Sequence, residues 1–191
     1  NGFAYHIGMN KNIIKSIKQL EKAKVEIVDT CSVNGIEFLN VSGIGFDAHI
    51  ANLFSKVRKR GFLTYLKLIF KEINYKPKQY QIEYGSINKK TKAFMISFAN
   101  ASQYGNNAQI SPNADIKDGL IDFVIVKEFP KWMIPFFLIK IVMGRIHLSK
   151  YTEIIRTNKM KIITKQSLIH VDGEPYHVKS PVSIKLFEKS L

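Results

Sequence analysis

The sequence has 191 residues, of which 46% are hydrophobic and 12% aromatic. This fits one globular domain, or two small ones, and excludes a disordered chain. The formal net charge of +14, from 29 Lys and Arg against 15 Asp and Glu, favours anionic partners such as nucleic acid, nucleotide phosphates or an anionic lipid surface. The single cysteine, Cys31, excludes an internal disulfide framework and is typical of a reducing compartment. Because Cys31 alternates with Ile27 and Val33, we expect it to be a small buried residue.

The elements follow from hydrophobic periodicity and turn residues. Helices are expected at 11–23, after the glycine turn at 43–45 with Asp47 as N-cap, at 62–73 and at 132–143. Asn34-Gly35 predicts a hairpin, and the polar connection 85–91 predicts a second one. The expected strands are 25–33, 36–42, 78–84, 92–100, 120–127, 153–164, 167–171, 176–179 and 182–187.

These elements predict an α+β fold that is mainly β: an antiparallel β-sandwich of about ten strands with a few helices. The most apolar segment, 132–143, has twelve residues and is interrupted by Pro135 and Lys140. It is too short to span a bilayer, which takes about 20 residues, so we expect a soluble or peripheral protein. The amino end, Asn1-Gly2-Phe3-Ala4, is turn chemistry with nothing ahead of it, and suggests a fragment.

Two acidic turns could carry chemistry. In His170-Val171-Asp172-Gly173-Glu174-Pro175, a carboxylate just after a tight turn can project from the rim of a sheet. Glu174 could then accept a proton from a substrate hydroxyl that attacks a phosphoryl group. The alternative is a plain hairpin turn with Glu174 as its solvated flank.

The second turn runs from Asp115 to Asp122. Mg²⁺ takes hard oxygen ligands, and this turn can offer a carboxylate together with main-chain oxygens at Asp115 and Leu120. The alternative is an Asp-Gly strand entry. The spacing excludes an EF-hand.

Other chemistries lack their signatures. The five histidines form no H-E-x-x-H pair, and no G-x-S-x-G, G-x-G-x-x-G or Walker loop is present. His170 and His177 flank the turn that carries Glu174, and we favour a structural role for both.

Four motifs, in the same order along the chain, resemble those of the diacylglycerol kinase-like lipid kinases. The resemblance is best to the soluble bacterial branch of that family. The first two are Asn1-Gly2-Phe3-Ala4 followed by Ile7-Gly8, similar to the tail of an amino-terminal signature, and Gly43-Ile44-Gly45-Phe46-Asp47-Ala48, similar to a G-x-G-F-D-A element. The third comprises Asn100, Gly105, Pro112, Ala114, Asp118-Gly119 and Asp122, and the fourth is the D-G-E motif in Val171-Asp172-Gly173-Glu174-Pro175.

The resemblance implies two domains: a nucleotide-binding α/β domain with a G-G-D-G-T loop, and a β-sandwich that helps to receive the lipid. Residues 1–23 would be the tail of the first domain, and 24–191 the second. The G-G-D-G-T loop is absent from this sequence. The resemblance therefore implies that ATP is bound mainly by a domain missing here, that its nucleotide-binding residues are unknown, and that this chain alone is inactive.

By the same resemblance, Glu174 is the base for the lipid hydroxyl. Asp118, with the carbonyl oxygens of Asp115 and Leu120, would hold a structural Mg²⁺. Tyr5 stands where many members have Arg, which weakens a phosphate contact at that position.

The implied partners are ATP, a lipid alcohol such as diacylglycerol, and an anionic membrane surface. We therefore expect a cytoplasmic protein, peripheral to the inner face of the membrane. The docking candidates are the basic cluster 56–60 and the pair Lys131 and Lys140, which flanks Trp132, Phe136 and Phe137. Exposed strand edges could also pair two copies into a homodimer.

Three rival functions remain. A non-catalytic lipid- or membrane-binding module would keep the acidic turns without chemistry. A nucleic-acid-binding domain would need stacking aromatics among basic residues, which Tyr75, Tyr80 and Tyr84 offer only faintly, so no nucleic acid is expected. An NAD kinase is related in fold, but the D-G-E-P context resembles the lipid branch more closely.

Overall fold

The computed structural model describes residues 2–58 and 61–191. Asn1 of the first motif, and Lys59 and Arg60 of the basic cluster, lie outside the described residues. The helices are α1 (Gly2–His6), α2 (Ile13–Leu20), α3 (Phe46–Ser55), α4 (Phe62–Lys71) and α5 (Ile134–Val142), with short 3₁₀ turns η1 (Lys131–Met133) and η2 (Ile146–Leu148). The strands are β1 (Thr30–Val33), β2 (Ile36–Phe38), β3 (Val41–Gly45), β4 (Lys78–Tyr84), β5 (Ile87–Ala99), β6 (Ile121–Lys127), β7 (Thr152–Thr157), β8 (Lys159–Ile163), β9 (Leu168–Val171), β10 (Glu174–His177) and β11 (Val182–Phe187).

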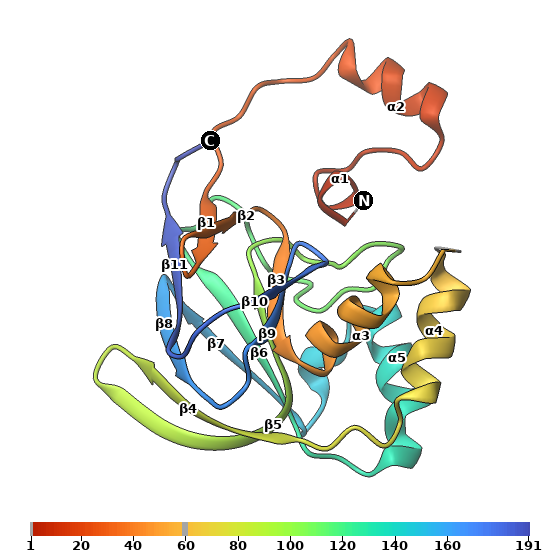
Figure 1. Cartoon of the computed structure of the whole chain (residues 1–191). Coiled ribbons are helices and arrows are strands. Elements are labelled where there is room, and N and C mark those ends of the chain that lie inside the picture. Colours follow the sequence, from red (N-terminus) through yellow and green to blue (C-terminus); the bar gives the residue numbers. More distant parts are fainter. Residues whose placement is uncertain (1, 59–60) are drawn as a thin grey trace.

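The strands form one curled sheet in which the described pairs are antiparallel. Its main order is β10-β9-β3-β5-β4-β8-β11-β1-β2, and β6 and β7 branch from β5. The long strand β5 makes this branch: its first half pairs with β4, and its second half pairs with both β3 and β6. A register shift between Ala93 and Met95 marks the change of partner. The expected mainly β, antiparallel sandwich-like fold is confirmed (Figure 1).

Strand β6 lies between two hydrophobic cores. Because successive side chains of a strand point to opposite faces, Phe123 and Ile125 pack into the core inside the curled sheet. Val124 and Val126 pack instead into a second core beneath the helices. This explains why the sequence of β6 is a nearly continuous apolar run: both of its faces are buried.

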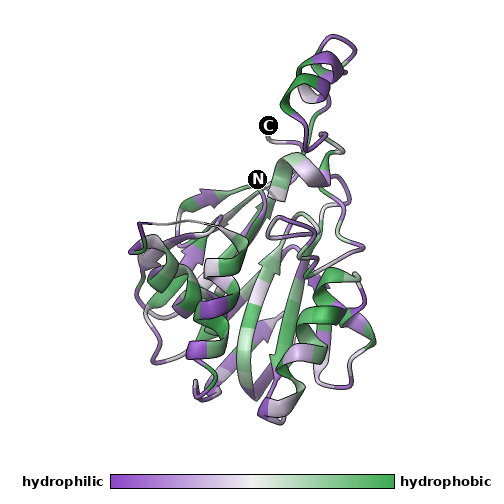
Figure 2. Cartoon of the chain, turned by 90° about the vertical axis from the view of Figure 1, so that its right-hand side faces the viewer, coloured by the Kyte–Doolittle hydropathy of each residue, from purple (hydrophilic) through white to green (hydrophobic). Residues whose placement is uncertain are grey.

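Helices α3, α4 and α5 cover the outer face of the β3-β5-β6 region (Figure 1). They contribute buried apolar side chains to the second core, among them Ile50, Ile69 and Phe137. Figure 2 shows that apolar residues, in green, predominate on these helices and on the strands between them. Strand β3 ends at Gly45, and α3 begins at the next residue, Phe46. The first turn of α3 therefore lies beside the sheet.

The amino-terminal segment lies apart from this body. Helix α1 packs against the loop after β5, where the ring nitrogen Nδ1 of His6 accepts a hydrogen bond from the backbone N–H of Ser102 (3.1 Å). Helix α2 projects away (Figure 1), and its apolar residues Ile13, Ile14 and Ile17 are exposed. Among the described residues, no helix has the length and apolar character needed to cross a bilayer.

Local turn chemistry agrees with the sequence. Asn34 and Gly35 have φ of 48° and 83° and join β1 to β2 in the expected hairpin. Asp172 and Gly173 have φ of 49° and 92° and join β9 to β10 in the same way. Cys31 is fully buried, as expected.

Other boundaries were predicted wrongly. The strand expected over 25–33 begins only at Thr30, and Val25 and Ile27 are exposed. The strand expected over 153–164 is two strands, β7 and β8, because β7 pairs with β6 whereas β8 pairs with β4 and β11. Asp47 is not the N-cap of α3; Gly45 has that position, and Asp47 lies in the first turn with its side chain buried.

Candidate functional site

A large apolar cavity lies among the helices that cover the sheet. Its volume is about 790 Å³, and it lies among α3, α4, α5 and the strands beneath them. The apolar side chains of its wall include Phe46, Phe54, Leu66, Ile69, Phe137 and Ile141. A cavity of this size and character suits a hydrophobic ligand.

One part of the wall is polar, and it contains Glu174. Asp47, Tyr104, His170 and Asp172 line the same part. Glu174 begins β10 and is exposed, and the described residues provide no hydrogen-bond partner for its carboxylate. The cavity therefore carries one unpaired carboxylate on its wall.

The backbone before Glu174 is held in place by Asp172. Both oxygens of the Asp172 carboxylate accept backbone hydrogen bonds, Oδ2 from Leu39 N–H and Oδ1 from Asn40 N–H, each at 3.0 Å. These bonds join the β9–β10 turn to the connection between β2 and β3, 132 and 133 positions away in sequence. The two carboxylates of the D-G-E motif thus differ: that of Asp172 anchors the turn, and that of Glu174 has no hydrogen-bond partner among the described residues.

The glycines of the G-x-G-F-D-A element bring Asp47 to this wall. A Cβ atom on Gly43 would lie 2.2 Å from Oδ2 of Asp47, so only glycine leaves room for the carboxylate. Gly45 has a φ of 104°, and a Cβ there would lie 2.8 Å from the carbonyl oxygen of Phe94. The motif is therefore a tight strand-to-helix turn that aims Asp47 into the protein.

Asp47 is the centre of a buried polar cluster. Its Oδ2 accepts hydrogen bonds from Ser97 Oγ at 3.0 Å and from the Tyr104 hydroxyl at 3.2 Å, and His170 Nε2 lies 3.3 Å away. Burial, followed by the nearby Asp47 carboxylate, raises the pKa of Tyr104 well above its ordinary value. Tyr104 therefore stays a neutral donor in this cluster.

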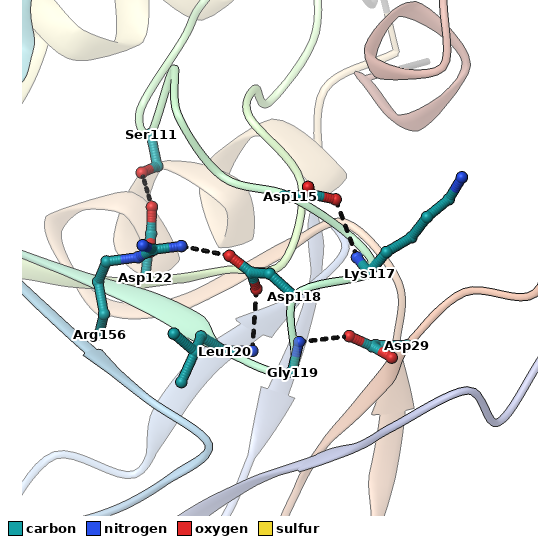
Figure 3. A network of polar contacts seen from close by, with 9 residues as sticks. All are labelled: Asp29, Ser111, Asp115, Lys117, Asp118, Gly119, Leu120, Asp122 and Arg156. Atoms are coloured by element: carbon teal, nitrogen blue, oxygen red, sulfur yellow. Dashed lines mark hydrogen bonds and ion pairs between the residues drawn. The ribbon is translucent and has the colours of Figure 1, made fainter.

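The second acidic turn forms a different network, shown in Figure 3. The Asp118 carboxylate pairs through Oδ2 with the guanidinium of Arg156, and its Oδ1 accepts from the backbone N–H of Leu120 at 3.0 Å. The same guanidinium donates from Nε to the buried carboxylate of Asp122 at 2.9 Å. Its hydrogen bond with Asp122, before its other interactions, raises the pKa of Arg156, which stays charged.

The rest of this network also consists of hydrogen bonds within the chain. Asp115 Oδ1 accepts from the backbone N–H of Lys117 at 3.0 Å. The buried Asp29 accepts from the backbone N–H groups of Gly119 at 2.9 Å and of Lys189 at 2.8 Å. Figure 3 shows Asp29 and Arg156 on opposite sides of the turn.

This arrangement does not suit the predicted Mg²⁺ site at Asp115, Asp118 and Leu120. A divalent cation needs carboxylate oxygens with free lone pairs, but the guanidinium of Arg156 already neutralises Asp118. Within residues 2–58 and 61–191, no group of three or more His, Cys, Asp or Glu is placed to hold a metal. The metal site remains a prediction, and no chemical step is assigned to it.

The two acidic turns are connected but do not share the cavity. Asp115, Asp118 and Leu120 are not part of its wall. The fully buried Asn100 links the turns, because its Nδ2 donates both to the carbonyl oxygen of Asp29 and to that of Leu39, at 3.1 and 2.9 Å. Asp29 holds the loop at Gly119, whereas Leu39 holds Asp172, so a chain of hydrogen bonds runs between the turns.

The docking candidates are only partly exposed. Phe137 is buried in the core, whereas Trp132 and Phe136 on the same segment are 69% and 54% exposed. Lys131 donates a hydrogen bond to Asn74 at 2.7 Å, and Lys140 donates to the carbonyl oxygen of Leu148 at 3.3 Å. Helix α5 thus has apolar residues on two faces: Phe137 on the face toward the core and Phe136 on the exposed face.

Sequence reasoning missed two features of the site. Helix α4 was recognised as a helix but not as a wall of the cavity. Asp47 and His170 were not connected, because they are 123 positions apart. The available signals were the glycine pair before Asp47 and the histidine two positions before Asp172.

Comparisons with known proteins agree with this fold. Residues 40–191 match the family described as the YegS C-terminal NAD kinase beta sandwich-like domain. Two relatives carry the name "Probable lipid kinase YegS-like". The protein from Chromohalobacter salexigens is 25% identical over 92% of this chain and 58% of its own length. The protein from Shewanella frigidimarina is 30% identical over 94% of this chain and 59% of its own length.

Solved structures from Bacillus anthracis str. Sterne share the fold. One, named "putative diacylglycerol kinase", has a TM-score of 0.75 and 23% identity, covering 99% of this chain and 63% of that one. Another, named as a diacylglycerol kinase, has a TM-score of 0.67 and 19% identity, covering 99% and 61%. The chain therefore spans about three fifths of the length of the proteins it matches.

Proposed function

This chain belongs to the family of YegS C-terminal NAD kinase β-sandwich-like domains, and we propose from this that it is the lipid-receiving part of an ATP-dependent lipid kinase. The relatives named as lipid kinases support the general activity. The proposed substrate is a lipid alcohol such as diacylglycerol. The observation that carries the proposal is the unpaired carboxylate of Glu174 on the wall of an apolar cavity.

The cavity supports a lipid more than a nucleotide as the ligand of this domain. Its wall is mostly aromatic and aliphatic, so it can bury a hydrocarbon chain, which gains about 0.8 kcal/mol for each methylene group removed from water. A dinucleotide, as in an NAD kinase, would need polar partners along most of its length. The acidic groups and the histidine of the wall, Asp47, His170, Asp172 and Glu174, lie near the β9–β10 turn, which suits a molecule with a single polar head.

In the proposed reaction Glu174 is the general base. The lipid hydroxyl oxygen attacks the γ-phosphorus of ATP, a new O–P bond forms, and the bond from phosphorus to the ADP oxygen breaks. The hydroxyl proton passes to the Glu174 carboxylate. General-base assistance of this kind contributes about 10²–10⁴-fold to the rate. Asp172 keeps the turn rigid so that Glu174 is already in position.

The nucleotide and any Mg²⁺ that accompanies its phosphates are proposed to be bound mainly outside the described site. No phosphate-binding glycine loop occurs in the sequence. We assign residues 1–23 to the neighbouring nucleotide-binding domain. The exposed apolar residues of α2, Ile13, Ile14 and Ile17, support this assignment because they lack the packing that an amphipathic helix needs.

The lipid is proposed to enter from an anionic membrane surface. Phe62 on α4 and Ile139 on α5 line the cavity and are also 42% and 54% exposed, so the cavity opens between apolar parts of two helices. Trp132 and Phe136, close to Ile139 in the sequence, are exposed apolar residues as well. The net charge of +14 attracts the protein to anionic lipid, at about 1 kcal/mol for each basic residue near the surface.

The test uses the whole protein that the gene encodes. It measures ATP-dependent phosphorylation of diacylglycerol in vesicles that also contain anionic lipid. Glu174→Gln should lower kcat by about 10²–10⁴-fold and leave lipid binding nearly unchanged. Glu37→Gln is the matched control, because Glu37 is an exposed glutamate on the edge strand β2, away from the cavity wall. Full activity of Glu174→Gln would exclude the base. Lipid binding without phosphorylation in the wild type would favour a non-catalytic lipid-binding module.

A further inference from the structure

His170 connects the buried carboxylate to the turn that carries Glu174. Its imidazole is almost fully buried, with Nε2 3.3 Å from Oδ2 of Asp47. The other ring nitrogen, Nδ1, lies 3.3 Å from the backbone nitrogen of Gly173, the residue before Glu174. The ring therefore lies between helix α3 and the β9–β10 turn.

The two partners fix the protonation state of the ring. The Gly173 backbone nitrogen can only donate, so Nδ1 must offer a lone pair. The Asp47 carboxylate can only accept, so Nε2 must carry the proton. Neutral imidazole protonated at Nε2 satisfies both bonds. A second proton, at Nδ1, would leave the Gly173 N–H without its acceptor.

The turn is therefore held from two sides. The Asp172 carboxylate ties it to the backbone of Leu39 and Asn40, on the side of β2 and β3. His170 ties it to the first turn of α3 through Asp47. The Asp172 bonds do not involve the N–H of Gly173, which has a φ of 92° and lies between Asp172 and Glu174. That N–H bonds to Nδ1 of His170, immediately before Glu174.

We propose that His170 is a positioning residue: as neutral imidazole, oriented by Asp47, it fixes the peptide of Gly173 and thereby the direction of the Glu174 carboxylate. This inference rests on the proposed function. The titratable groups around the ring are Asp47 from α3, Tyr104 from the loop after β5, and Asp172 and Glu174 from the turn. A proton at Nδ1 would break the link to Gly173.

The first experiment does not depend on activity. Two-bond ¹H–¹⁵N correlation spectra of the gene product should show His170 protonated at Nε2 and bare at Nδ1 at pH 8. The Gly173 amide resonance should move as the ring gains its second proton on acidification. A ring protonated at Nδ1 at pH 8, or a Gly173 amide that ignores protonation of the ring, would overturn the inference even if the protein is a kinase.

The second experiment uses kinetics of variants. His170→Ala removes both bonds and should lower kcat by about 10²-fold with KM little changed, because misplacement of a reacting group by about 1 Å has effects of this size. His170→Asn offers an acceptor near the position of Nδ1. It should recover most of the kcat that His170→Ala loses.

These outcomes separate the two proposals. If Glu174→Gln is fully active, the general-base role of Glu174 is wrong, whereas the tautomer and the Gly173 response still test the link itself. If Glu174→Gln is inactive but His170→Asn recovers none of the activity that His170→Ala loses, the general base stands and the positioning role is wrong. Because His170→Ala removes a buried side chain, its thermal unfolding must be measured; the tautomer of His170 and the response of the Gly173 amide decide the matter if His170→Ala does not fold.

Discussion

Arg156 and Asp122 face each other across two neighbouring strands: they are register partners on β7 and β6, and Nε of the guanidinium lies 2.9 Å from Oδ1 of the buried carboxylate. The same guanidinium pairs with Asp118 in the preceding loop. Arg156 therefore holds the acidic turn from the side of β7, whereas Asp29 holds it at Gly119.

We expect Arg156→Gln to lower the free energy of unfolding by about 1–3 kcal/mol, because it leaves the buried Asp122 carboxylate without its charged donor. Ser111 Oγ still donates to Asp122 and limits the loss. Denaturant unfolding measures the effect. Arg145→Gln, at an exposed arginine, is the matched control. Equal unfolding free energies for the two variants would show that the pair contributes nothing.

The same substitution tests the predicted metal. In the wild type, Mg²⁺ must compete with the guanidinium for Asp118. Arg156→Gln removes that competitor, so millimolar Mg²⁺ should raise the melting temperature of the variant more than that of the wild type. Thermal unfolding with and without Mg²⁺ is the measurement, with NaCl at matched ionic strength as the control. A larger shift in the wild type would mean that Mg²⁺ binds with Arg156 in place.

Stability should fall with acid through His6. Partial burial lowers the pKa of His6, with a smaller opposing effect of Asp115. The unfolded chain therefore binds the proton more readily than the folded one, and stability decreases as the pH falls through the ordinary value of about 6.5. Protonation of Nδ1 also removes the acceptor of the Ser102 N–H.

The check is the unfolding free energy of the wild type and of His6→Gln between pH 8 and 5. The wild type should lose stability relative to the variant as the pH falls below about 6.5. His147→Gln, at an exposed histidine, serves as the control. A difference between wild type and His6→Gln that stays constant over this range would contradict the prediction.

Filling the cavity should weaken lipid binding. Ala51 on α3 lines the cavity and is 8% exposed, so Ala51→Phe places a ring in the space proposed for the hydrocarbon chain. Exclusion of about two methylene groups costs about 1.6 kcal/mol, or roughly fifteenfold in Kd. Binding of a fluorescent diacylglycerol analogue measures this, with the smaller Ala51→Val as a graded control. Unchanged affinity with Ala51→Phe would place the lipid elsewhere.

The sequence determined the features that depend on neighbouring residues. The Asn34-Gly35 and Asp172-Gly173 turns were predictable because positive φ values favour these residues and two-residue hairpins require them. The mainly β fold was predictable from the alternation of apolar and polar residues along the expected strands. The position of Glu174 just after a turn was also readable, and Glu174 begins β10 directly after that turn. Its role as the base stays a prediction.

Only the tertiary structure decided which distant groups meet. Asp118 could not be assigned to Arg156 from the sequence, because their contact depends on the pairing of β6 with β7. Asp47 and His170 meet because β3 pairs with β9, which brings the start of α3 beside the turn. Burial decided their chemistry, since a carboxylate and an imidazole removed from water must satisfy each other rather than solvent.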